Sequence, residues 1–567
     1  MKVSDYIVTY LAGKGITDVF GYPGGMVTYL MESFHKYRGE ITAHVNYHEQ
    51  GSAFAACGYA QAALRPGVAY GTSGPGATNM FTGIANAFFD STPTIFITGQ
   101  VNTYESKAGT RARQKGFQEM DVVAAVDSYT KYSAYVESEA DIRYHLEKAY
   151  HFALEGRPGP VLLDIPMNVQ RQEVTPEELR SFTPSPDDDA DIEQLVGVIA
   201  DSLGSAERPV VIAGAGIQAA GMGVSFNSWI EAAGVPVVTS MLAVDLMPGS
   251  ELNYGFIGAY GDRAANFLVA KADLVVSIGS RLDIRQTGAD LAGFAPGARL
   301  IRVDIDPCEL TNRVKEDETQ LIADLRTLLP ALLNRAVTRD FASWISVANE
   351  LREQLDGYDH LPPNDLIAGF SALVPSNAVV TTDVGQNQVW VAQSFKMRGQ
   401  RVLFSGGHGA MGYSLPAAIG AYYATRDLVV AFTGDGGIQM NIQELQFLAR
   451  EQIPVKIVLV NNNSLGMIRH FQEMYFDQSY VQTVPQGGFT LPDFGGIAAG
   501  YRIPYVKVAD ASDLPLVAEV MASEGPALIE LLVGSQTYVY PKLAMGKEPQ
   551  DQEPELPREL YTRLNAL

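Results

Sequence analysis

Six short apolar runs, rich in β-branched residues, limit the fold of this chain more than any other feature. They are PVLLDIP (160–166), PVVIAG (209–214), DLVVSIGS (273–280), LIRVDID (300–306), DLVVAFTGDG (427–436) and PVKIVLVNNN (454–463). Longer segments with helical spacing separate them. Runs that are apolar at nearly every position are typical of strands buried on both faces, which requires helices on both sides of a parallel sheet. The sequence therefore predicts an α/β fold built from doubly wound domains with parallel sheets.

Two linker-like segments divide the chain into three such blocks. TPSPDDD (183–189) has prolines that oppose a helix and three acids that repel one another, and LPPND (361–365) follows a charged helical segment. We expect three doubly wound domains at residues 1–182, 190–335 and 360–540, with a tail at 541–567. Because the tail is acidic and rich in proline, we expect an irregular wrap or lid there rather than a packed element.

The composition excludes several classes of protein. The 567 residues include 41 Lys and Arg against 64 Asp and Glu, a formal net charge of −23, so no surface for nucleic acid or anionic lipid is expected. Two cysteines, Cys57 and Cys308, are too few for a disulfide framework or a thiolate zinc site. No apolar run approaches the roughly 20 residues of a membrane span, and the opening residues lack a secretory signal pattern. We therefore expect a cytoplasmic protein.

The most specific motif is Gly434-Asp435-Gly436, followed one helix and one strand later by Asn462. Consecutive parallel strands would deliver Asp435 and Asn462 to the same edge of a sheet. A carboxylate and an amide oxygen are suitable Mg²⁺ ligands, with phosphate oxygens and water completing the shell. The glycines would let the backbone approach a diphosphate closely. An Asp-Gly turn and an Asn-rich turn without any ligand remain the alternative.

A second constellation lies in the first block. It consists of GYPGG (21–25), HEQ (48–50) and TSGPGATN (72–79). Glu49 begins a segment of small residues that would pack closely, so desolvation should raise its pKa and suit proton exchange with a heterocyclic nitrogen. The alternative is a glutamate at a helix start that interacts with the helix dipole.

Together these segments resemble the thiamine-diphosphate enzymes, and specifically the catalytic subunit of acetolactate synthase. The resemblance covers nearly the whole chain through VFGYPGG, HEQGSAFAACGYA, TSGPGATN, GRPGPVLLDIP, VDIDP, VGQNQ, GGHGAMGYSLPAAIG and GDGGIQMNIQEL. It implies a pyrimidine-binding domain at 1–182, a central flavin-binding domain at 190–335 and a diphosphate- and magnesium-binding domain at 360–540. It also implies a homodimer or homotetramer, with thiamine diphosphate bound between subunits.

The resemblance implies roles for individual residues. Glu49 matches the glutamate that protonates the aminopyrimidine N1′ and helps form the C2 ylide, and Gly25 lies beside the reacting centre. Phe117 and Gln118 match residues that line the substrate channel. The expected Mg²⁺ ligands are Asp435, Asn462 and the carbonyl of Ser464. Contacts to thiamine diphosphate are expected from Gln386, Asn387, Gly409, Met411, Gly434, Gly436, Gly437 and Met467.

The middle block resembles the flavin-contacting part of the same family. The expected FAD contacts are Arg157, Gly214, Gly216, Arg281, Asp283, Arg285, Asp304 and Asp324. A plain strand-to-helix turn at Gly214 and a solvated strand end after Gly279 are the alternatives. In acetolactate synthase the flavin takes no net part in redox chemistry, and the resemblance implies the same here.

The sequence differs from the family pattern at positions that are expected to contact the second substrate. Phe471 replaces a typical tryptophan and forms the expected acceptor pocket with Met467, while Lys115-Gly116 replaces a frequent Asp-Ala pair. The resemblance therefore extends to acetolactate-synthase-like carboligases of polysaccharide pathways, such as the flavoenzyme of yersiniose biosynthesis. The acceptor is then either a 2-keto acid or a ketone such as a nucleotide-linked keto-deoxysugar.

The expected reaction decarboxylates pyruvate and transfers a two-carbon unit to a second carbonyl. A flavin-coupled pyruvate oxidase is the alternative, which the synthase-type flavin segment disfavours. A simple pyruvate decarboxylase is weaker because the chain has no His-His pair. The intact Glu49, Asp435 and Asn462 oppose a non-catalytic paralogue. The sequence does not identify the acceptor and does not distinguish a dimer from a tetramer. It also does not show whether a regulatory subunit binds.

Overall fold

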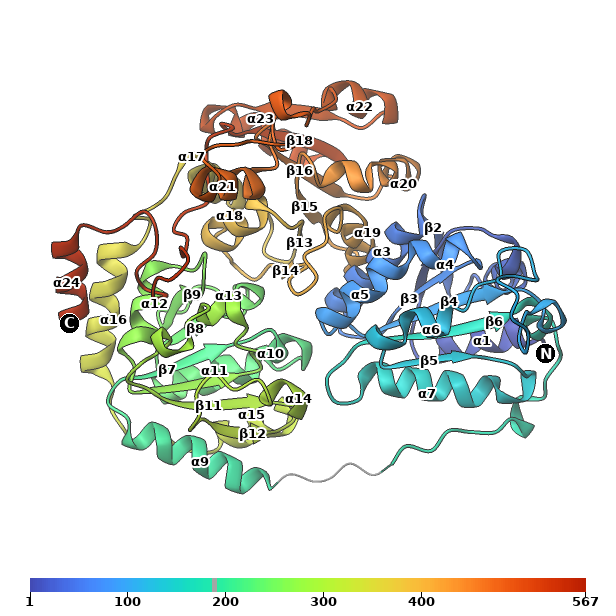
Figure 1. The fold of residues 1–567 in the computed structure, drawn as a ribbon, viewed down its shortest axis with the longest axis horizontal. Coiled ribbons are helices and arrows are strands. Elements are labelled where there is room, and N and C mark those ends of the chain that lie inside the picture. Colours follow the sequence, from blue (N-terminus) through green and yellow to red (C-terminus); the bar gives the residue numbers. More distant parts are fainter. Residues whose placement is uncertain (186–190) are drawn as a thin grey trace. The chain divides into compact units, whose positions relative to one another are not determined.

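The computed structural model describes residues 1–185 and 191–567, and within them the chain forms three six-stranded sheets (Figure 1). The predicted linker at 183–189 and the expected start of the middle domain at 190 lie mostly outside the described residues. By proximity the chain divides into two compact units. Unit 1 comprises Met1–Pro186, Asn377–Asn387 and Leu403–Leu532, and unit 2 comprises Asp187–Ser376, Gln388–Val402 and Val533–Leu567.

The first sheet, in unit 1, has the strand order β2-β1-β3-β4-β6-β5 and parallel pairing. Its strands are β1 (Asp18–Gly21), β2 (Thr42–Val45), β3 (Gly67–Gly71), β4 (Thr94–Gln100), β5 (Tyr132–Tyr135) and β6 (Pro160–Pro166). The helices are α1 (Val3–Gly13), α2 (Thr28–Lys36), α3 (Glu49–Ala63), α4 (Pro75–Asn79), α5 (Phe81–Phe89), α6 (Val122–Val126), α7 (Ile142–Leu154) and α8 (Met167–Gln170).

Both faces of this sheet are buried, as the apolar runs require. Successive residues of a strand point to opposite faces, and here they enter two different apolar clusters. Phe20 and Leu162 belong to one cluster, while their neighbours Val19 and Val161 belong to the other. This is the physical reason that the runs lack polar alternation.

The third sheet has the order β14-β13-β15-β16-β18-β17. Its strands are β13 (Val379–Thr382), β14 (Arg401–Leu403), β15 (Val429–Gly434), β16 (Val455–Asn461), β17 (Tyr505–Val508) and β18 (Ala527–Leu532). The helices of this part are α18 (Gln386–Ser394), α19 (Ser414–Thr425), α20 (Leu445–Glu451), α21 (Gly466–Tyr475), α22 (Phe494–Tyr501) and α23 (Leu514–Ala522).

The middle sheet, in unit 2, has the order β12-β11-β10-β7-β8-β9. Its strands are β7 (Pro209–Ala213), β8 (Val237–Thr239), β9 (Asn253–Phe256), β10 (Leu274–Ile278), β11 (Arg299–Asp304) and β12 (Thr319–Ile322). Besides most of α18, the helices of unit 2 are α9 (Ile192–Ser205), α10 (Gly216–Ala219), α11 (Gly223–Ala233), α12 (Arg263–Lys271), α13 (Ile284–Thr287), α14 (Pro307–Leu310), α15 (Leu325–Leu333), α16 (Ala342–Leu355), α17 (Pro362–Ser371) and α24 (Arg558–Ala566).

All six apolar runs form strands, namely β6, β7, β10, β11, β15 and β16, which confirms the predicted α/β class with parallel sheets. The end of the chain differs from the prediction of an irregular tail. Arg558–Ala566 form α24, and Leu564 is fully buried in the apolar core of unit 2 together with Leu556. Leu560 and Tyr561 of the same helix pack against this core, so an apolar face docks α24 although the preceding residues are polar. The domain boundaries proposed from the sequence remain a prediction.

Each sheet has a central reversal of strand order, and chemistry-bearing residues lie at each of these three reversals. In the first sheet the reversal falls between β1 and β3, in the middle sheet between β7 and β10, and in the third between β13 and β15. At such a point the connections leave toward opposite faces, and a crevice opens at the carboxyl ends of the strands. The segments GYPGG and TSGPG, the loops at Gly214 and Gly279, and the motif GDG all follow these strands.

Helices α3 and α19 join the first and third sheets within unit 1. A Cβ on Gly420 would lie 1.8 Å from the carbonyl oxygen of Ala55, and a Cβ on Gly58 would lie 2.1 Å from that of Ala417. Only glycine permits this backbone approach. Residues of both sheets and both helices consequently form one continuous apolar cluster.

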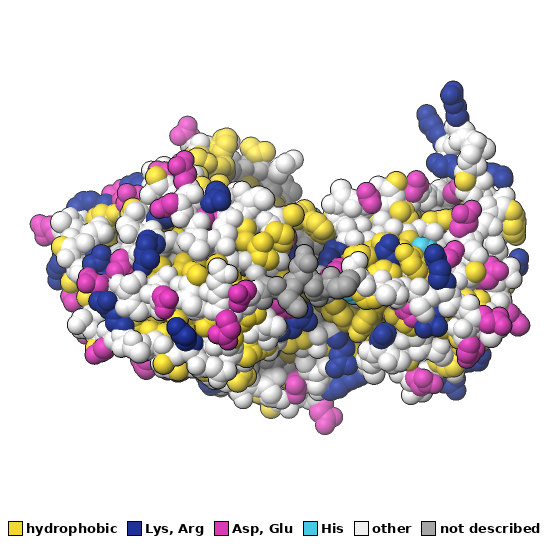
Figure 2. Space-filling view, turned by 90° about the horizontal axis from the view of Figure 1, so that it is seen from below, with side chains coloured by type: hydrophobic (Ala, Val, Ile, Leu, Met, Phe, Trp, Pro, Cys, Tyr) yellow, Lys and Arg dark blue, Asp and Glu magenta, His cyan; other side chains and the backbone are white. Residues whose placement is uncertain are grey.

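Figure 2 shows acidic and basic side chains interspersed on the face drawn, rather than a continuous basic field. Within the described residues, no helix has both the length and the apolar character that a membrane span requires.

Replacing Gly420 with Ala tests the helix junction. We expect Gly420→Ala to lower the free energy of unfolding by about 1–3 kcal/mol, because the added methyl group overpacks a backbone contact. Gly500→Ala in α22 is the control, since nothing lies within 4 Å of its Cβ position. That variant should gain roughly 0.5–1 kcal/mol. Thermal unfolding followed by circular dichroism measures both, and equal shifts would contradict the close helix contact.

Candidate active site

Two polar side chains meet at the carboxyl edge of the third sheet. Strands β15 and β16 are hydrogen-bonded neighbours, and Asp435 follows the first while Asn462 follows the second. Asp435 Oδ2 accepts the backbone N–H of Asn462 at 3.1 Å and that of Ser464 at 3.3 Å. All three side chains are buried. The structure thus brings together the residues predicted as magnesium ligands.

The donor set fits a hard divalent cation. Burial raises the pKa of Asp435 to about 6, although four backbone N–H groups stabilise its charged form. A bound cation would compensate such a desolvated carboxylate. The Asn462 amide donates to Gln386 Oε1 at 2.6 Å, and its Oδ1 remains available as an oxygen ligand. Among the described residues no three His, Cys, Asp or Glu side chains gather as a metal site, so a metal here needs amide and carbonyl oxygens as well as this carboxylate.

Glycines hold the surrounding loops against one another. A Cβ on Gly466 would lie 1.9 Å from Gln386 Oε1, and one on Gly437 would lie 2.1 Å from Asp383 Oδ2. A Cβ on Gly436 would lie 3.1 Å from Met411 Cε. The loops after β13, β15 and β16 therefore pack into one tight cradle, and closely packed glycine loops are suited to binding a diphosphate through backbone N–H groups.

Further predicted cofactor contacts border this cradle. Asn387 Oδ1 is buried and has no hydrogen-bond partner among the described residues, and its Nδ2 lies 3.5 Å from the Cβ position of Gly434. The buried Ser464 Oγ likewise has none within the described part of the chain. Gly409 has φ +65° and lies against Val384, two residues after the end of β13. Unpartnered buried oxygens here are consistent with a polar ligand.

The three segments of the first block also converge. Glu49 is the first residue of α3, and its Oε2 accepts the side-chain N–H of Asn79 at 2.9 Å. A Cβ on Gly76 would lie 3.3 Å from Glu49 Oε1. Thr72 Oγ1 accepts the N–H of Met26 at 3.2 Å, which ties GYPGG to the loop after β3. The predicted proximity of these segments is therefore present in the structure.

Gly25 and Glu49 differ in their surroundings. Gly25 begins the short 3-10 helix η1 (Gly25–Val27), and nothing lies within 4 Å of its Cβ position, so the space beside it is open. Glu49 is buried, with 8% of its surface exposed, in the first turn of α3. That position suits an interaction with the helix dipole as well as proton exchange.

Asn441 and Glu444, which the sequence reasoning missed, connect this region with the cradle. Asn441 Nδ2 donates to Gln50 Oε1 at 3.0 Å and to the carbonyl of Gly412 at 2.9 Å. The fully buried Glu444 accepts the side-chain N–H of Asn46 and the backbone N–H of Tyr47, both at 2.9 Å. Residues on both sides of Glu49 are thereby anchored to the segment after GDG.

The predicted channel residues have contrasting exposure. Gln118 has φ +62°, and its carbonyl oxygen lies 2.9 Å from the Cβ position of Gly74, so it borders the TSGPG loop. The Phe117 side chain is 79% exposed in this chain. Lys115 Nζ donates to the carbonyl of Tyr104 at 2.9 Å. The 115–118 segment is thus placed beside the Glu49 region, with Phe117 directed to solvent.

The predicted acceptor residues share one face of α21. Met467 and Phe471 are four positions apart, which places them on the same side of a helix. Phe471 is 38% exposed, and its ring centroid lies 4.8 Å from that of Tyr475 and 5.8 Å from that of Phe476. Because α21 starts two residues after Ser464, this aromatic group is close in sequence to the predicted Mg²⁺ ligands at the edge of the third sheet.

The predicted flavin residues of unit 2 lie along the carboxyl edge of the middle sheet. The N–H of Gly214 donates to Ile278 O at 2.9 Å, and the N–H of Gly216 donates to Gly279 O at 3.0 Å. A Cβ on Gly214 would lie 2.1 Å from Gly279 O, so the two loops meet backbone to backbone. A glycine cradle of this kind fits the close approach of a dinucleotide.

The charged residues at this edge largely pair within their own loops. Arg281 contacts Asp283 at 3.1 Å, and Asp283 also accepts the N–H of Arg285 at the start of α13. Asp304 ends β11 and Asp324 caps α15. The remaining predicted contact, Arg157, belongs to unit 1, where its Nε donates to Ser91 Oγ at 2.7 Å.

The pH dependence of stability tests the Glu444 anchor. Burial raises the pKa of Glu444 to about 7 from its ordinary 4.5. The folded state therefore keeps this proton to higher pH than the unfolded chain, and its contribution to stability falls as pH rises from about 4.5 to 7. Relative to Glu444→Gln, the wild type should lose up to about 3 kcal/mol across this range. The exposed Glu519→Gln is the control, and a pH-independent difference for Glu444→Gln in calorimetric unfolding would contradict the burial effect.

Comparisons with known proteins agree with this geometry. Three thiamine pyrophosphate enzyme families match in order: the N-terminal TPP binding domain at residues 1–125, the central domain at 196–332 and the C-terminal TPP binding domain at 383–531. The chain is 36% identical to the acetolactate synthase large subunit of Lactococcus lactis subsp. lactis, over 96% of this chain and 94% of the relative. It is 35% identical to the isozyme 2 large subunit of Escherichia coli K12, over 96% and 98%, and 38% identical to the large subunit of Corynebacterium glutamicum, over 94% and 87%. The chain therefore belongs to the acetolactate synthase large-subunit family of thiamine pyrophosphate enzymes.

Proposed function

We propose that this protein decarboxylates pyruvate and transfers the resulting two-carbon unit to a second carbonyl compound. The observation that carries the proposal is the edge of the third sheet, where Asp435 and Asn462 meet beside closely packed glycine loops. Glu49 supplies the buried carboxylate of the first block, and the resemblance places the cofactor between these two parts of different subunits. Thiamine diphosphate, when bound, supplies the nucleophilic carbon that takes up pyruvate and releases CO₂.

The chain's own residues then have defined tasks. Glu49 exchanges a proton with the cofactor's pyrimidine through the carboxylate that Asn79 orients. Asp435, Asn462 and the Ser464 carbonyl hold Mg²⁺, and the glycine loops leave backbone groups for the diphosphate. Burial of these groups excludes water and strengthens their electrostatic interactions.

FAD is proposed as a bound, non-redox group at the carboxyl edge of the middle sheet. The backbone contact between the Gly214 and Gly279 loops and the Arg281–Asp283 pair support it. A flavin-coupled pyruvate oxidase is not favoured, because the curated relatives described above are named acetolactate synthases.

The acceptor is proposed to be a 2-keto acid or a ketone such as a nucleotide-linked keto-deoxysugar. The partly exposed Phe471 supports an acceptor other than a 2-keto acid, because phenylalanine is smaller than the indole of tryptophan and lacks its N–H donor. We also propose a homodimer or homotetramer in the cytoplasm. Exposed apolar side chains in and after α21, including Ile468, Phe476 and Val481, support association of subunits.

The magnesium proposal is tested by cofactor binding. Asp435→Asn removes the charged ligand, so we expect Mg²⁺-dependent affinity for thiamine diphosphate to fall by roughly 10²-fold or more. Isothermal titration calorimetry on the full chain, with and without Mg²⁺, measures this without requiring turnover. Asp427→Asn is the matched control, in which a half-buried carboxylate that accepts the Asn377 amide is replaced. Unchanged Mg²⁺ dependence in Asp435→Asn would remove this residue from the site.

The reaction is tested with product analysis. The wild type should consume pyruvate and form a carboligation product with pyruvate alone, with 2-ketobutyrate or with an added ketone. Glu49→Gln should lower kcat about 10²–10⁴-fold because it cannot exchange the proton. The exposed Glu40→Gln should retain activity. Peroxide formation from pyruvate and oxygen would favour the oxidase, and unchanged carboligation by Glu49→Gln would exclude Glu49 from the mechanism.

A further inference from the structure

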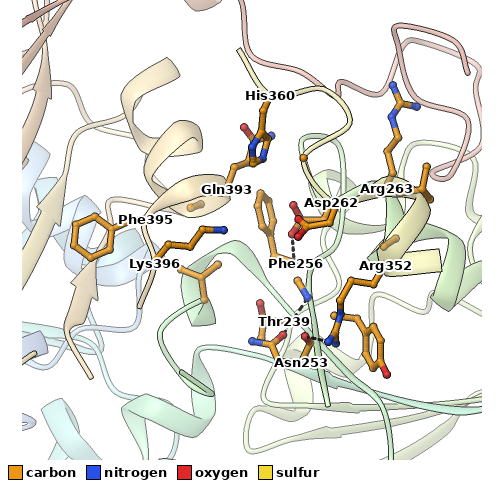
Figure 3. A pocket seen from close by; sticks show the side chains of 18 of the residues that line it. Thr239, Asn253, Phe256, Asp262, Arg263, Arg352, His360, Gln393, Phe395 and Lys396 are labelled. Atoms are coloured by element: carbon orange, nitrogen blue, oxygen red, sulfur yellow. Dashed lines mark hydrogen bonds between the residues drawn. The ribbon is translucent and has the colours of Figure 1, made fainter. Parts of the chain in front are cut away.

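The loop at residues 106–116 of unit 1 leads directly into the proposed channel residues Phe117 and Gln118. In this it differs from a cavity of about 400 Å³ in unit 2, which Asp262 and Lys396 border and whose lining includes none of the residues proposed for the reaction (Figure 3). The closure of the 106–116 loop can therefore affect the proposed channel directly.

One carboxylate, that of Glu119, holds this loop closed. Its Oε1 accepts the hydroxyl of Ser106 at 3.0 Å and the backbone N–H of Lys107 at 2.5 Å, both on the outgoing arm. Its Oε2 accepts the backbone N–H groups of Lys115 and Gly116 at 2.8 and 3.2 Å, both on the returning arm. The two oxygens of a single side chain thus connect the two arms.

The charged form of Glu119 suits this position. Although burial favours the protonated form, the three backbone N–H groups hold the pKa of Glu119 below its ordinary value. The two lysines use their ammonium groups elsewhere in the loop, since Lys107 Nζ donates to the carbonyl of Arg113 and Lys115 Nζ to that of Tyr104, both at 2.9 Å. Hydrogen bonds to a charged acceptor are stronger than those to a neutral one, so the carboxylate is the main closing contact.

The segment that follows the loop is attached to the end of β4. A Cβ on Gly116 would lie 3.0 Å from Val101 Cγ1, so the returning arm packs directly on the residue after this strand. Gln100, the last residue of β4, donates from Nε2 to the carbonyl of Met120 at 2.8 Å. Both ends of the segment at 116–120 therefore rest on the sheet.

Gln118 has a backbone conformation that needs such support. Its φ of +62° lies in the left-handed region, which is unfavourable for a residue other than glycine. Its carbonyl oxygen lies 2.9 Å from the Cβ position of Gly74, and two residues later the Cβ position of Gly76 lies 3.3 Å from Glu49 Oε1. A shift of Gln118 would therefore reach the loop that packs beside Glu49.

We propose that Glu119 is a positioning residue, whose carboxylate closes the 106–116 loop and thereby fixes Gln118 against the TSGPG loop. The inference rests on the function proposed above, because that function places Gln118 in the substrate channel. Loss of the carboxylate releases both arms at once, whereas the cradle of the third sheet and the bond between Glu49 and Asn79 stay in place. Substrate turnover should therefore suffer, and cofactor affinity should not.

Trypsin measures the closure without any turnover. Arg111 and Arg113 are exposed, but a protease can cut after them only when the loop opens. Glu119→Gln keeps the size of the side chain and removes its charge, so we expect cleavage there to become about 5-fold faster or more. Asp121→Asn is the matched control, because this carboxylate caps α6 instead of binding the loop, and it should be cut at the wild-type rate.

A second variant keeps the test decisive if Glu119→Gln does not fold, which circular dichroism checks. Ser106→Ala removes one of the four donors and leaves the carboxylate in place, so cleavage should become about 2-fold faster. Cleavage at the wild-type rate in every folded variant of Glu119 and Ser106 would overturn the closing role of the carboxylate.

Kinetics and cofactor binding then test the positioning role. Glu119→Gln should lower kcat/KM for pyruvate in carboligation by about 10-fold or more, because a displaced channel segment orients the substrate poorly. Isothermal titration calorimetry should give wild-type affinity for thiamine diphosphate with Mg²⁺. Faster cleavage with wild-type kcat/KM, or an equal loss of cofactor affinity, would overturn the positioning role. Absence of any carboligation product in the wild type would instead refute the proposed function, and with it this role, while the trypsin comparison still decides whether Glu119 closes the loop.

Discussion

The reversal of strand order in each parallel sheet is the constraint on which this structure depends. Chain connections on the two sides of a reversal cross opposite faces, so the carboxyl ends of the two strands there are left uncovered. The chain uses that position three times, after β1 and β3, after β7 and β10, and after β13 and β15. Glycines occupy the loops at each of them, because side chains would clash with the facing backbone. Polar ligands can therefore approach the sheet edge without opening the apolar core.

The second constraint is the contact between α3 and α19. Gly58 and Gly420 bring the two helix backbones together, so the first and third sheets share one apolar cluster. That rigid junction lets Glu444 and Asn441 bind the residues flanking Glu49. Glu49 is thus held by a buried polar network from a distant part of the sequence. In a core of this density, a shift of either helix would displace the carboxylate from its position.

Local groups around the site, rather than the net charge of the chain, determine how well it can bind anions. The chain carries a formal charge of −23, yet a pyruvate and a diphosphate are both anions. Compensation must come from local groups, namely backbone N–H groups in glycine loops and the proposed Mg²⁺ beside Asp435.

The sequence by itself determined the α/β class, the six strand segments and the pairing of Asp435 with Asn462, because these depend on local apolar runs and on neighbouring strands. Long ordered motifs also predicted the family. Only the tertiary structure decided the partners of Glu444, which lie nearly 400 positions away in sequence, and the exposure of Phe117. It also decided that the acidic tail ends in a docked helix, since burial of Leu564 depends on a surface made by other segments. Local sequence carries no information on such contacts, because they form only when distant elements pack.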